Sequence, residues 1–393
     1  MSRRGLKSVA LGAGCGYGDA TCAYLAGLDA LGIPVSWQPI DGDLASRGTR
    51  SRFVKNVPEA IRPQLNKLWQ RSIEHDAALI SIPPIQWHKE FLEREVEHRR
   101  FCYATWELER LPPSWASVFN HFDGIFVPSN FNARTFRTGG VNTPISVIPH
   151  VARAALTPAS RPNWLAQLEG LYVFYTIGTW TSRKGMEDTV RAYLSSFKGN
   201  DDVCLVIKTD ALDLIKSEFC HRDDDTDRHC AVWYTLAKVL ADYPDPARIH
   251  LIAKRVPATE IDALHARGDC YVSLTHSEGW GLGAFDALQF STPVIMPGYG
   301  GQMDYLGEQY PLLVRHTMEP VNSTPSDGYF EGMEQEEWGR ACPDHAGELM
   351  RMVYEDRDTA AELGRKMQQA IVTDFSPHRI CTNLASKLGL SQS

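Results

Sequence analysis

The stretch at residues 275–301, THSEGWGLGAFDALQFSTPVIMPGYGG, decides the fold of this chain. An apolar run leads into it, and glycines follow that allow unusual backbone angles and the close approach of a ligand. The sequence then predicts a helix over 283–290, which ends at Thr292-Pro293, and a buried strand over 294–296. A strand, a glycine turn (residues 278–283), a helix and a second strand are together typical of an α/β protein.

Two carboxylates bracket this glycine turn, Glu278 at its mouth and Asp286 one helical turn further on. A helix N-terminus attracts anions because its first N–H groups lack partners and the helix dipole is positive there. Carboxylates beside an anion would hold hydroxyl groups, so we expect a ligand with a diphosphate and sugar hydroxyls. His276, beside the turn, either shapes the choice of sugar or caps the turn. The alternative is a tight strand-to-helix crossover without a ligand.

Three cations lie where they would neutralise such a phosphate. A second strand–helix series starts with a strand over 171–177 and continues in the loop WTSRKG, which carries Arg183 and Lys184. The strand predicted over 203–207 ends in Lys208. A cation at the carboxyl end of a strand, opposite a helix N-terminus, is well placed to bind phosphate.

The chain opens with a βαβ pattern, in which a strand over 8–11 precedes a helix over 21–31 and a strand over 33–37. Four alternating glycines lie in the first turn, but the dinucleotide-binding pattern G-x-G-x-x-G fails in every register. In the register that starts at Gly12, Tyr17 occupies the position of the third glycine, and in the register that starts at Gly14, Asp19 does. We therefore expect a wide loop and a helix that starts late, and we disfavour a dehydrogenase. An ordinary glycine-rich turn is the alternative.

Further candidate side chains follow other predicted strands of the N-terminal half. They are His88, Trp106, Glu107 and Ser129, and Ser129 is also the predicted N-cap of a helix over 130–138. Open α/β sheets bind ligands beyond the carboxyl ends of their strands, so each is either a substrate contact or a structural residue.

A basic cluster comprises Arg47, Arg50, Arg52 and Lys55. One interpretation is that this cluster binds an anionic acceptor or a membrane surface. The alternative is that it is a solvated loop without a ligand.

The composition excludes several classes of function. The length of 393 residues suffices for two domains, and the net charge of −8 argues against nucleic acid as a partner. No apolar run approaches the roughly 20 residues that a bilayer crossing needs. Nine scattered cysteines without a C-x-x-C pair fit a reducing cytosol, so we expect a cytoplasmic protein.

An acidic loop lies between Cys220-His221 and His229-Cys230. A zinc site there is the alternative to a solvated loop, which we favour because adjacent residues rarely both point at one ion. We expect no metal cofactor. Taken together, the patterns predict two doubly wound α/β domains that face each other across a cleft, separated by a linker within 151–168. Helices over about 336–355 and 358–372 are predicted near the end of the second domain.

Four segments in order give the chain a family resemblance. They are GCGYGDATCAYLAGLDALGIPV (14–35), FVPSNFNARTFRTGGVNTPISVIPHV (126–151), IGTWTSRKGMEDTVRAY (177–193) and SEGWGLGAFDALQFSTPVI (277–295). Together they resemble the family 4 glycosyltransferases, retaining enzymes of the GT-B fold. Glu278 and Asp286 match the two acids of the family's E-x7-E motif. The segment YATWELERLPPSW (103–115) is similar to a bacterial branch that builds polysaccharide or lipopolysaccharide.

The resemblance implies domain boundaries and roles. Residues 1–155 would bind the acceptor, residues 156–375 the nucleotide sugar, and a last helix over about 376–393 would pack back on the first domain. Glu278 would contact sugar hydroxyls, and Asp286, although shorter than the family's acid, would hold the ribose.

Other implied roles concern the phosphates, the base and the acceptor. The diphosphate would meet Lys184 and the backbone N–H groups of Gly281, Leu282 and Gly283. The base would lie near Arg255 and Val256, and the loop Gly16–Gly18 would lie next to the phosphates, with Tyr17 toward the acceptor.

Two departures from the family pattern concern the chemistry. Thr179 stands where the family often has Arg, and Arg183 would replace that charge. A His that the family often has after its fourth N-domain strand is replaced by the segment Thr105-Trp106-Glu107, which leaves Glu107, Trp106 and His88 as candidates on the acceptor side.

The predicted function is a retaining hexosyltransferase that uses a UDP- or GDP-sugar and a glycan, lipid-linked or other hydroxyl acceptor. The leaving diphosphate would assist deprotonation of the acceptor. Cations and the helix dipole would stabilise the charge of the leaving group, so no metal is required. The expected location is the cytoplasm, with contact to the inner membrane surface. The alternatives are a sugar-nucleotide epimerase on the same fold and a non-catalytic sugar-nucleotide-binding protein.

Overall fold

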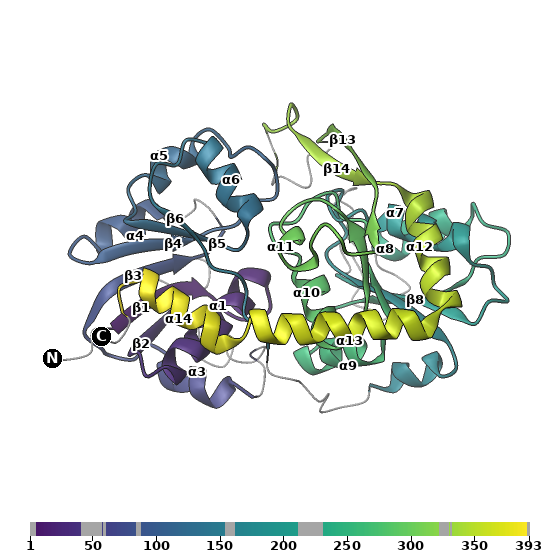
Figure 1. Ribbon diagram of the computed structural model, residues 1–393, viewed down its shortest axis with the longest axis horizontal. Helices are drawn as coiled ribbons and strands as arrows, with labels where there is room; N and C mark the ends of the chain where they lie inside the picture. The colour runs from purple at the N-terminus through teal and green to yellow at the C-terminus, as the bar shows by residue number, and fades with distance from the viewer. Residues whose placement is uncertain are drawn as a thin grey trace. The chain divides into compact units, whose positions relative to one another are not determined.

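A computed structural model gives the structure of the protein and describes residues 5–40, 57, 60–83, 88–153, 162–210, 231–321, 330 and 332–390. The chain forms two compact units (Figure 1). Unit 1 comprises residues 1–154 and 372–393, and unit 2 comprises residues 155–371. The prediction of two doubly wound α/β domains is confirmed. The sequence placed the first domain boundary after residue 155 and the second after residue 375. In the structure the units divide after residue 154 and after residue 371.

Unit 1 is built on a six-stranded parallel sheet in the order β2-β1-β3-β4-β5-β6. Its strands are β1 (Gly5–Leu11), β2 (Val35–Ile40), β3 (His75–Ser81), β4 (Arg99–Tyr103), β5 (Gly124–Val127) and β6 (Ile145–Val147). Its helices are α1 (Gly16–Ala30), α3 (Arg62–Leu68), α4 (His88–Arg94), α5 (Trp115–Phe119), α6 (Asn130–Thr138) and α14 (Pro377–Lys387). The strand order reverses between β1 and β3, which makes the carboxyl ends of these strands a topological switch point.

Unit 2 has a second six-stranded parallel sheet, in the order β12-β11-β10-β7-β8-β9. Its strands are β7 (Tyr172–Ile177), β8 (Val203–Thr209), β9 (Arg248–Ala253), β10 (Cys270–Val272), β11 (Val294–Pro297) and β12 (Leu313–Val314). Its helices are η1 (Asn163–Leu168), α7 (Met186–Ser196), α8 (Ala231–Leu240), α9 (Ala258–Arg267), α10 (Leu282–Gln289), α11 (Met303–Leu306) and α12 (Pro343–Glu355). Here the order reverses between β7 and β10.

A two-stranded antiparallel ribbon of β13 (His316–Pro320) and β14 (Glu337–Ala341) completes unit 2. The helix predicted over 336–355 is wrong in its first part, because residues 337–341 form β14 and the helix α12 begins only at Pro343. Trp338 is buried, and the residues around it pair along the whole length of β13, so tertiary contacts override the local preference.

The helix α1 also differs from its prediction, since it begins at Gly16 and not at residue 21. A Cβ on Gly18 would lie 1.8 Å from the Gly12 carbonyl oxygen, so glycine lets the first helical turn press against the end of β1. Asp19 accepts a hydrogen bond from the Gly14 N–H at 2.9 Å. The glycines thus bring the helix close instead of delaying it.

The long helix α13 (Arg357–Asp374) leads out of unit 2, and α14 then lies along α1 in unit 1 (Figure 1). A Cβ on Gly27 would lie 2.3 Å from Cys381 Sγ, which shows how closely the two helices pack. Leu384 and Leu388 are fully buried in the same core cluster as Leu28 of α1.

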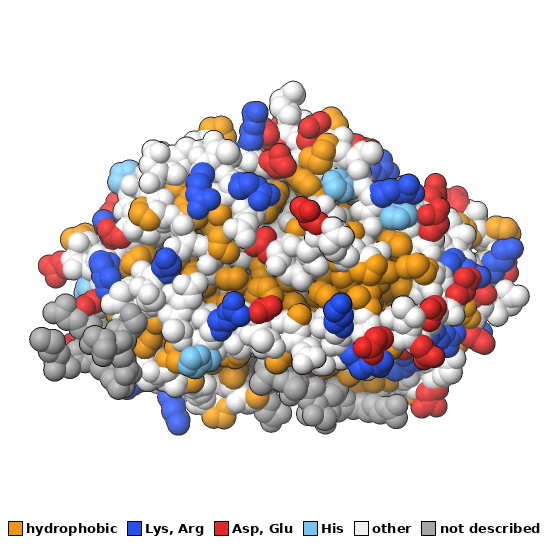
Figure 2. All heavy atoms as spheres, in the orientation of Figure 1, with side chains coloured by type: hydrophobic (Ala, Val, Ile, Leu, Met, Phe, Trp, Pro, Cys, Tyr) orange, Lys and Arg blue, Asp and Glu red, His pale blue; other side chains and the backbone are white. Residues whose placement is uncertain are grey.

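The described surface is mixed in charge. On the face drawn in Figure 2, Lys and Arg side chains are interspersed with Asp and Glu side chains. Along the described part of the chain, no helix combines the length and the apolar character that a membrane crossing requires.

Candidate active site

The candidate site of unit 2 lies at the switch point of its sheet. The loop after β7 carries Arg183 and Lys184, and the loop after the neighbouring strand β10 carries Glu278. The two loops are hydrogen-bonded to each other, because the His276 N–H donates to the Arg183 carbonyl oxygen at 2.7 Å. The hydroxyl of Thr275 donates to the same carbonyl at 3.2 Å.

The carboxylate of Glu278 is the centre of this site. Lys184 Nζ lies 2.5 Å from Oε1, Arg183 Nη1 lies 3.2 Å from Oε2, and Thr275 Oγ1 lies 3.1 Å from Oε1. Arg183 also donates to the Ser277 carbonyl oxygen at 2.7 Å. Burial by itself raises the pKa of Glu278, but the charges of Lys184 and Arg183 outweigh it and lower that pKa to about 2. The carboxylate is therefore ionised at neutral pH.

Two glycines permit this close packing. Gly185 has φ +55°, and a Cβ there would lie 2.0 Å from the Leu274 carbonyl oxygen. Gly300 has φ +100°, and a Cβ there would lie 2.9 Å from the Glu278 carbonyl oxygen, which accepts a hydrogen bond from the Gly301 N–H at 2.7 Å. Both backbone approaches require glycine.

The glycine turn leads directly into α10. Gly281 precedes the helix with φ +85°, and its carbonyl oxygen accepts a hydrogen bond from the Tyr305 hydroxyl at 3.1 Å. A Cβ on Gly283 would lie 2.5 Å from the Tyr271 hydroxyl oxygen. The backbone N–H groups of Leu282 and Gly283 open the helix, where intrahelical acceptors are lacking. This end of α10 therefore has the form of an anion site.

Asp286 lies one turn into α10 and is partly exposed. It accepts a hydrogen bond from the Gln289 side chain at 2.9 Å. Burial raises the pKa of Tyr305, and the charges of Glu278 and Asp286 both act in the same direction. The two acids thus share one electrostatic neighbourhood.

The remaining candidates of unit 2 lie on other strand ends. Lys208 is the last but one residue of β8, beside β7; it is buried and donates to the Thr209 carbonyl oxygen at 3.0 Å. Arg255 is exposed and Val256 partly exposed in the loop after the edge strand β9. Their roles toward phosphate and base stay predictions.

His276 joins the site to the β13–β14 ribbon. Its ring packs against Trp338 with 4.7 Å between ring centroids, and its carbonyl oxygen accepts a hydrogen bond from the Gly339 N–H at 3.0 Å. Its Nε2 lies 3.6 Å from Asp188, whose carboxylate also lies 3.4 Å from Arg340. Burial opposes ionisation of Asp188, but the contact with His276 and the charge of Arg340 lower its pKa. No local pattern in the sequence indicated this ribbon contact, and a sugar-selecting role of His276 stays a prediction.

In unit 1, the start of α1 contacts the segment after β4. Gly16 opens α1, and the hydroxyl of Tyr17 accepts a hydrogen bond from the Thr105 N–H at 3.0 Å. Trp106 is fully buried and donates through Nε1 to the Arg110 carbonyl oxygen at 2.6 Å. Glu107 is also buried.

Asn132 of α6 organises the same segment and was missed by the sequence analysis. Its Oδ1 accepts hydrogen bonds from Thr105 Oγ1 at 2.9 Å and from the Trp106 N–H at 3.2 Å, and its Nδ2 donates to the Trp106 carbonyl oxygen at 2.6 Å. Its own N–H is capped by Ser129 at 3.2 Å. The signal available in the sequence was an amide three residues after a predicted N-cap.

His88 is fully buried at the start of α4, with its ring against Phe119 and Phe122 at 6.0 and 5.9 Å between centroids. Burial lowers its pKa to about 4, so the ring is neutral at pH 7. This is the environment of a core histidine, and its predicted acceptor role is untested. Ser129 proves to be the N-cap of α6. The basic cluster 47–55 and the loop 220–230 lie outside the described residues.

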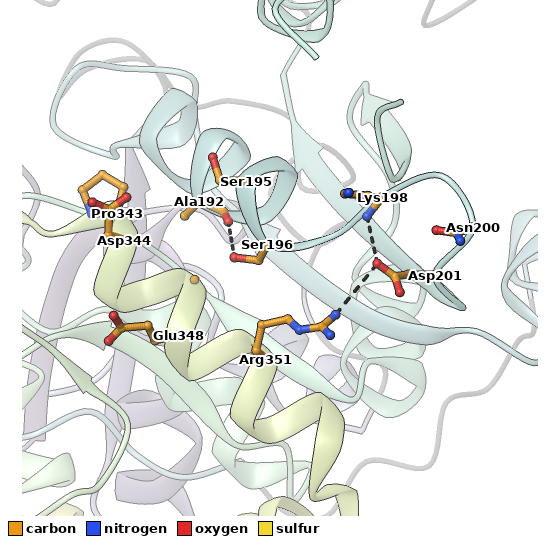
Figure 3. Close-up of a pocket in the computed structure, with 11 residues that line it drawn as sticks. Ala192, Ser195, Ser196, Lys198, Asn200, Asp201, Pro343, Asp344, Glu348 and Arg351 are labelled. Carbon is orange, nitrogen blue, oxygen red and sulfur yellow. Dashed lines mark hydrogen bonds and ion pairs between the residues drawn. The ribbon is translucent and has the colours of Figure 1, made fainter. Parts of the chain in front are cut away.

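A separate groove of about 520 Å³ lies between α12 and the end of α7 (Figure 3). Arg351 approaches Asp201 there at 3.8 Å. The groove is lined by side chains from within 192–201 and from within 343–351. The first segment leads into the amino end of β8, so the groove lies at the amino ends of the strands, whereas Glu278 follows the carboxyl end of β10. We therefore place the candidate active site at Glu278 and its contacts, and not in this groove.

Comparison with solved structures gives the class of fold. A glycosyltransferase from Rickettsia africae superimposes with a TM-score of 0.66 at 14% identity, with both chains fully covered. Sucrose-phosphate synthase from Thermosynechococcus elongatus gives 0.63 at 14% identity over 98% of each chain. HepE from Anabaena, solved with UDP-glucose, gives 0.63 at 12% identity over 98% of this chain and 99% of its own.

The chain thus has the GT-B fold of these glycosyltransferase structures. No family model matches the sequence, and no curated protein matches it significantly.

Proposed function

We propose that this protein is a retaining glycosyltransferase that moves a hexose from a UDP- or GDP-sugar to a hydroxyl acceptor. The observation that carries the proposal is the pairing of Lys184 and Arg183 with the ionised Glu278 beside the start of α10. Two cations, a helix N-terminus and a carboxylate at a topological switch point suit a ligand that combines phosphates with hydroxyls.

In this proposal each group has a task at the leaving diphosphate. Lys184, Arg183 and the first N–H groups of α10 stabilise the negative charge that develops there. Glu278 accepts hydrogen bonds from the donor sugar, and Asp286 accepts them from the ribose. The diphosphate assists removal of the acceptor proton on the same face, so the sugar keeps its anomeric configuration without an enzyme nucleophile or a metal.

Solved structures of the same fold support the nucleotide sugar as donor. HepE was solved with UDP-glucose, and an Escherichia coli protein with a TM-score of 0.63 was solved with UDP-2-fluoro glucose. The resemblance to family 4 supports an acceptor of glycan or lipid-linked type in bacterial polysaccharide or lipopolysaccharide assembly. Unit 1 would bind that acceptor in the cytoplasm, at the inner membrane surface.

The test is a transfer assay over UDP- and GDP-sugars with glycan and lipid-linked acceptors. We expect one donor class to give a product with the donor's anomeric configuration, established by NMR. Because hydrogen bonds to charged groups contribute about 1.5–3 kcal/mol, Glu278→Ala should lower kcat/KM at least about tenfold. Glu348→Gln, an exposed acid on α12, is the matched control.

Three outcomes would contradict the proposal. Full activity of Glu278→Ala would remove the site assignment. An isomerised sugar nucleotide formed without acceptor would identify an epimerase. Donor binding by calorimetry with no turnover on any acceptor would identify a binding protein.

A further inference from the structure

Two histidines and a glutamate meet in unit 1 at the amino end of its sheet. His75 is the first residue of β3, and Glu95 and His98 lie in the connection between α4 and β4. One ligand atom from each of the three lies within 4.8 Å of the others. The sequence analysis did not single out these residues, because they are spaced irregularly and the fold brings them together.

The two distances from the histidines to Glu95 match those between ligands around one ion. His75 Nε2 lies 3.5 Å from Glu95 Oε2, and His98 Nδ1 lies 3.3 Å from the same oxygen. Zinc bonds of about 2.0–2.1 Å in tetrahedral geometry place two ligand atoms about 3.4 Å apart. Within the described structure, His98 Nδ1 has no hydrogen-bond partner despite this proximity. The 3.3 Å contact of His98 is therefore not a hydrogen bond, whereas the 3.5 Å contact of His75 with the same oxygen is within hydrogen-bond distance.

Lys7 of β1 supports the carboxylate from its other side. Its Nζ is hydrogen-bonded to Glu95 Oε1, so Oε2 alone faces the two imidazoles. A ligating carboxylate whose second oxygen is held by a hydrogen bond is the usual arrangement at metal sites, where such partners orient the ligand.

Burial and access also suit a metal. The Glu95 side chain is only 4% exposed, whereas those of His75 and His98 are 18% and 29% exposed, so an ion can enter from solvent. The two imidazole rings stack with 4.1 Å between their centroids and 22° between their planes. Three protein ligands leave a fourth position for water.

We propose that His75, Glu95 and His98 bind a divalent first-row transition ion, with Zn²⁺ as the best match to two imidazoles and one carboxylate. The bound ion ties the start of β3 to the α4–β4 connection. The site belongs to the amino end of the strands, whereas Tyr17 and Thr105 lie at their carboxyl ends, so its task is structural.

The test is a titration of the full-length chain with Zn²⁺ and Co²⁺ after treatment with a chelator. The background carries Cys220→Ser, His221→Ala, His229→Ala and Cys230→Ser, because these residues offer a second place for metal. We expect one ion per chain by calorimetry, intense visible absorption from four-coordinate Co²⁺, and a melting temperature that Zn²⁺ raises.

His98→Ala and His75→Ala should each weaken Zn²⁺ binding at least about 100-fold and should abolish the rise in melting temperature. This exceeds the 10–100-fold typical of losing a residue that only hydrogen-bonds to a metal ligand. His378→Ala, an exposed histidine on α14, is the matched control and should bind as the background does. No binding by the background chain, or unchanged affinity in His98→Ala and His75→Ala, would overturn the proposal.

Discussion

The charges of Lys184 and Arg183 keep Glu278 ionised, and this has a consequence for stability. Its pKa is lowered from 4.5 to about 2 in the folded protein, so its ionised form stabilises the fold above pH 4.5. That contribution is lost as the pH falls from about 4.5 toward 2. From the two pKa values, the contribution of Glu278 to the free energy of unfolding should fall by about 2 kcal/mol between pH 7 and pH 3.

The measurement is urea unfolding at pH 7 and pH 3 for the wild type and Glu278→Gln. The wild type should lose about 2 kcal/mol more than the variant over this interval, because glutamine does not titrate. Glu348→Gln should behave as the wild type, since its carboxylate is exposed. An equal loss in the wild type and Glu278→Gln would show that the ion pairs do not stabilise the folded state.

Gly185 offers a second prediction at the residue scale. Gly185→Ala combines a left-handed backbone with a Cβ 2.0 Å from the Leu274 carbonyl oxygen, and should destabilise unit 2 by about 2–5 kcal/mol. Gly170→Ala is the control, because its φ of +76° is equally unfavourable but no atom lies within 4 Å, so only about 1–2 kcal/mol is expected. If denaturant unfolding showed equal losses of stability in Gly185→Ala and Gly170→Ala, the loop backbone would be able to shift away from the added Cβ without cost.

Among the elements, α6 positions the segment after β4 through one amide. Asn132→Ala removes the partners of Thr105 and of both backbone groups of Trp106, and should destabilise unit 1 by about 2–4 kcal/mol. Because the change lies in unit 1, it should raise the acceptor KM and leave donor binding unchanged. Asn130→Ala, at an exposed position of the same helix, is the control. A loss of donor affinity in Asn132→Ala would contradict this separation.

The sequence predicted elements whose signal is local. The strand, glycine turn and helix around Glu278 appear as expected, because glycines, a proline stop and an apolar run act over a few residues. The contact between Lys184 and Glu278 spans 94 positions and depends on β7 and β10 being neighbours. The doubly wound pattern implies such neighbours without fixing which side chains meet.

Elements whose shape depends on distant partners escaped prediction. β14 has the composition of a helix start but pairs with β13 and buries Trp338 against His276. The start of α1 depends on how closely Gly18 approaches Gly12, a fact of tertiary packing. The cluster of His75, Glu95 and His98 likewise exists only once β3 and β4 are side by side.

At the scale of the whole molecule, unit 1 needs the last part of the chain. Ile380, Leu384 and Leu388 of the C-terminal segment are buried in its core. Their burial is worth roughly 5–9 kcal/mol together, which is comparable to the whole stability of a domain. A chain that stops after Ile371 should therefore lose the cooperative unfolding of unit 1, while unit 2 keeps its own transition and binds the donor.

Calorimetric scans of this truncated chain test the point, with a chain that stops after Leu390 as the control. The control should show both transitions. A truncated chain in which unit 1 still unfolds cooperatively would show that α14 contributes little to its core.

The return of the chain to unit 1 also bears on how the protein is made. Domains usually fold in the order of their synthesis, the N-terminal one first. Here the sequence of unit 2 is complete at Ile371, whereas the core of unit 1 closes only when residues up to Leu388 have left the ribosome. The second unit can therefore finish folding while the first still exposes the face of α1 that α14 will cover. During translation this uncovered face is where a chaperone would bind.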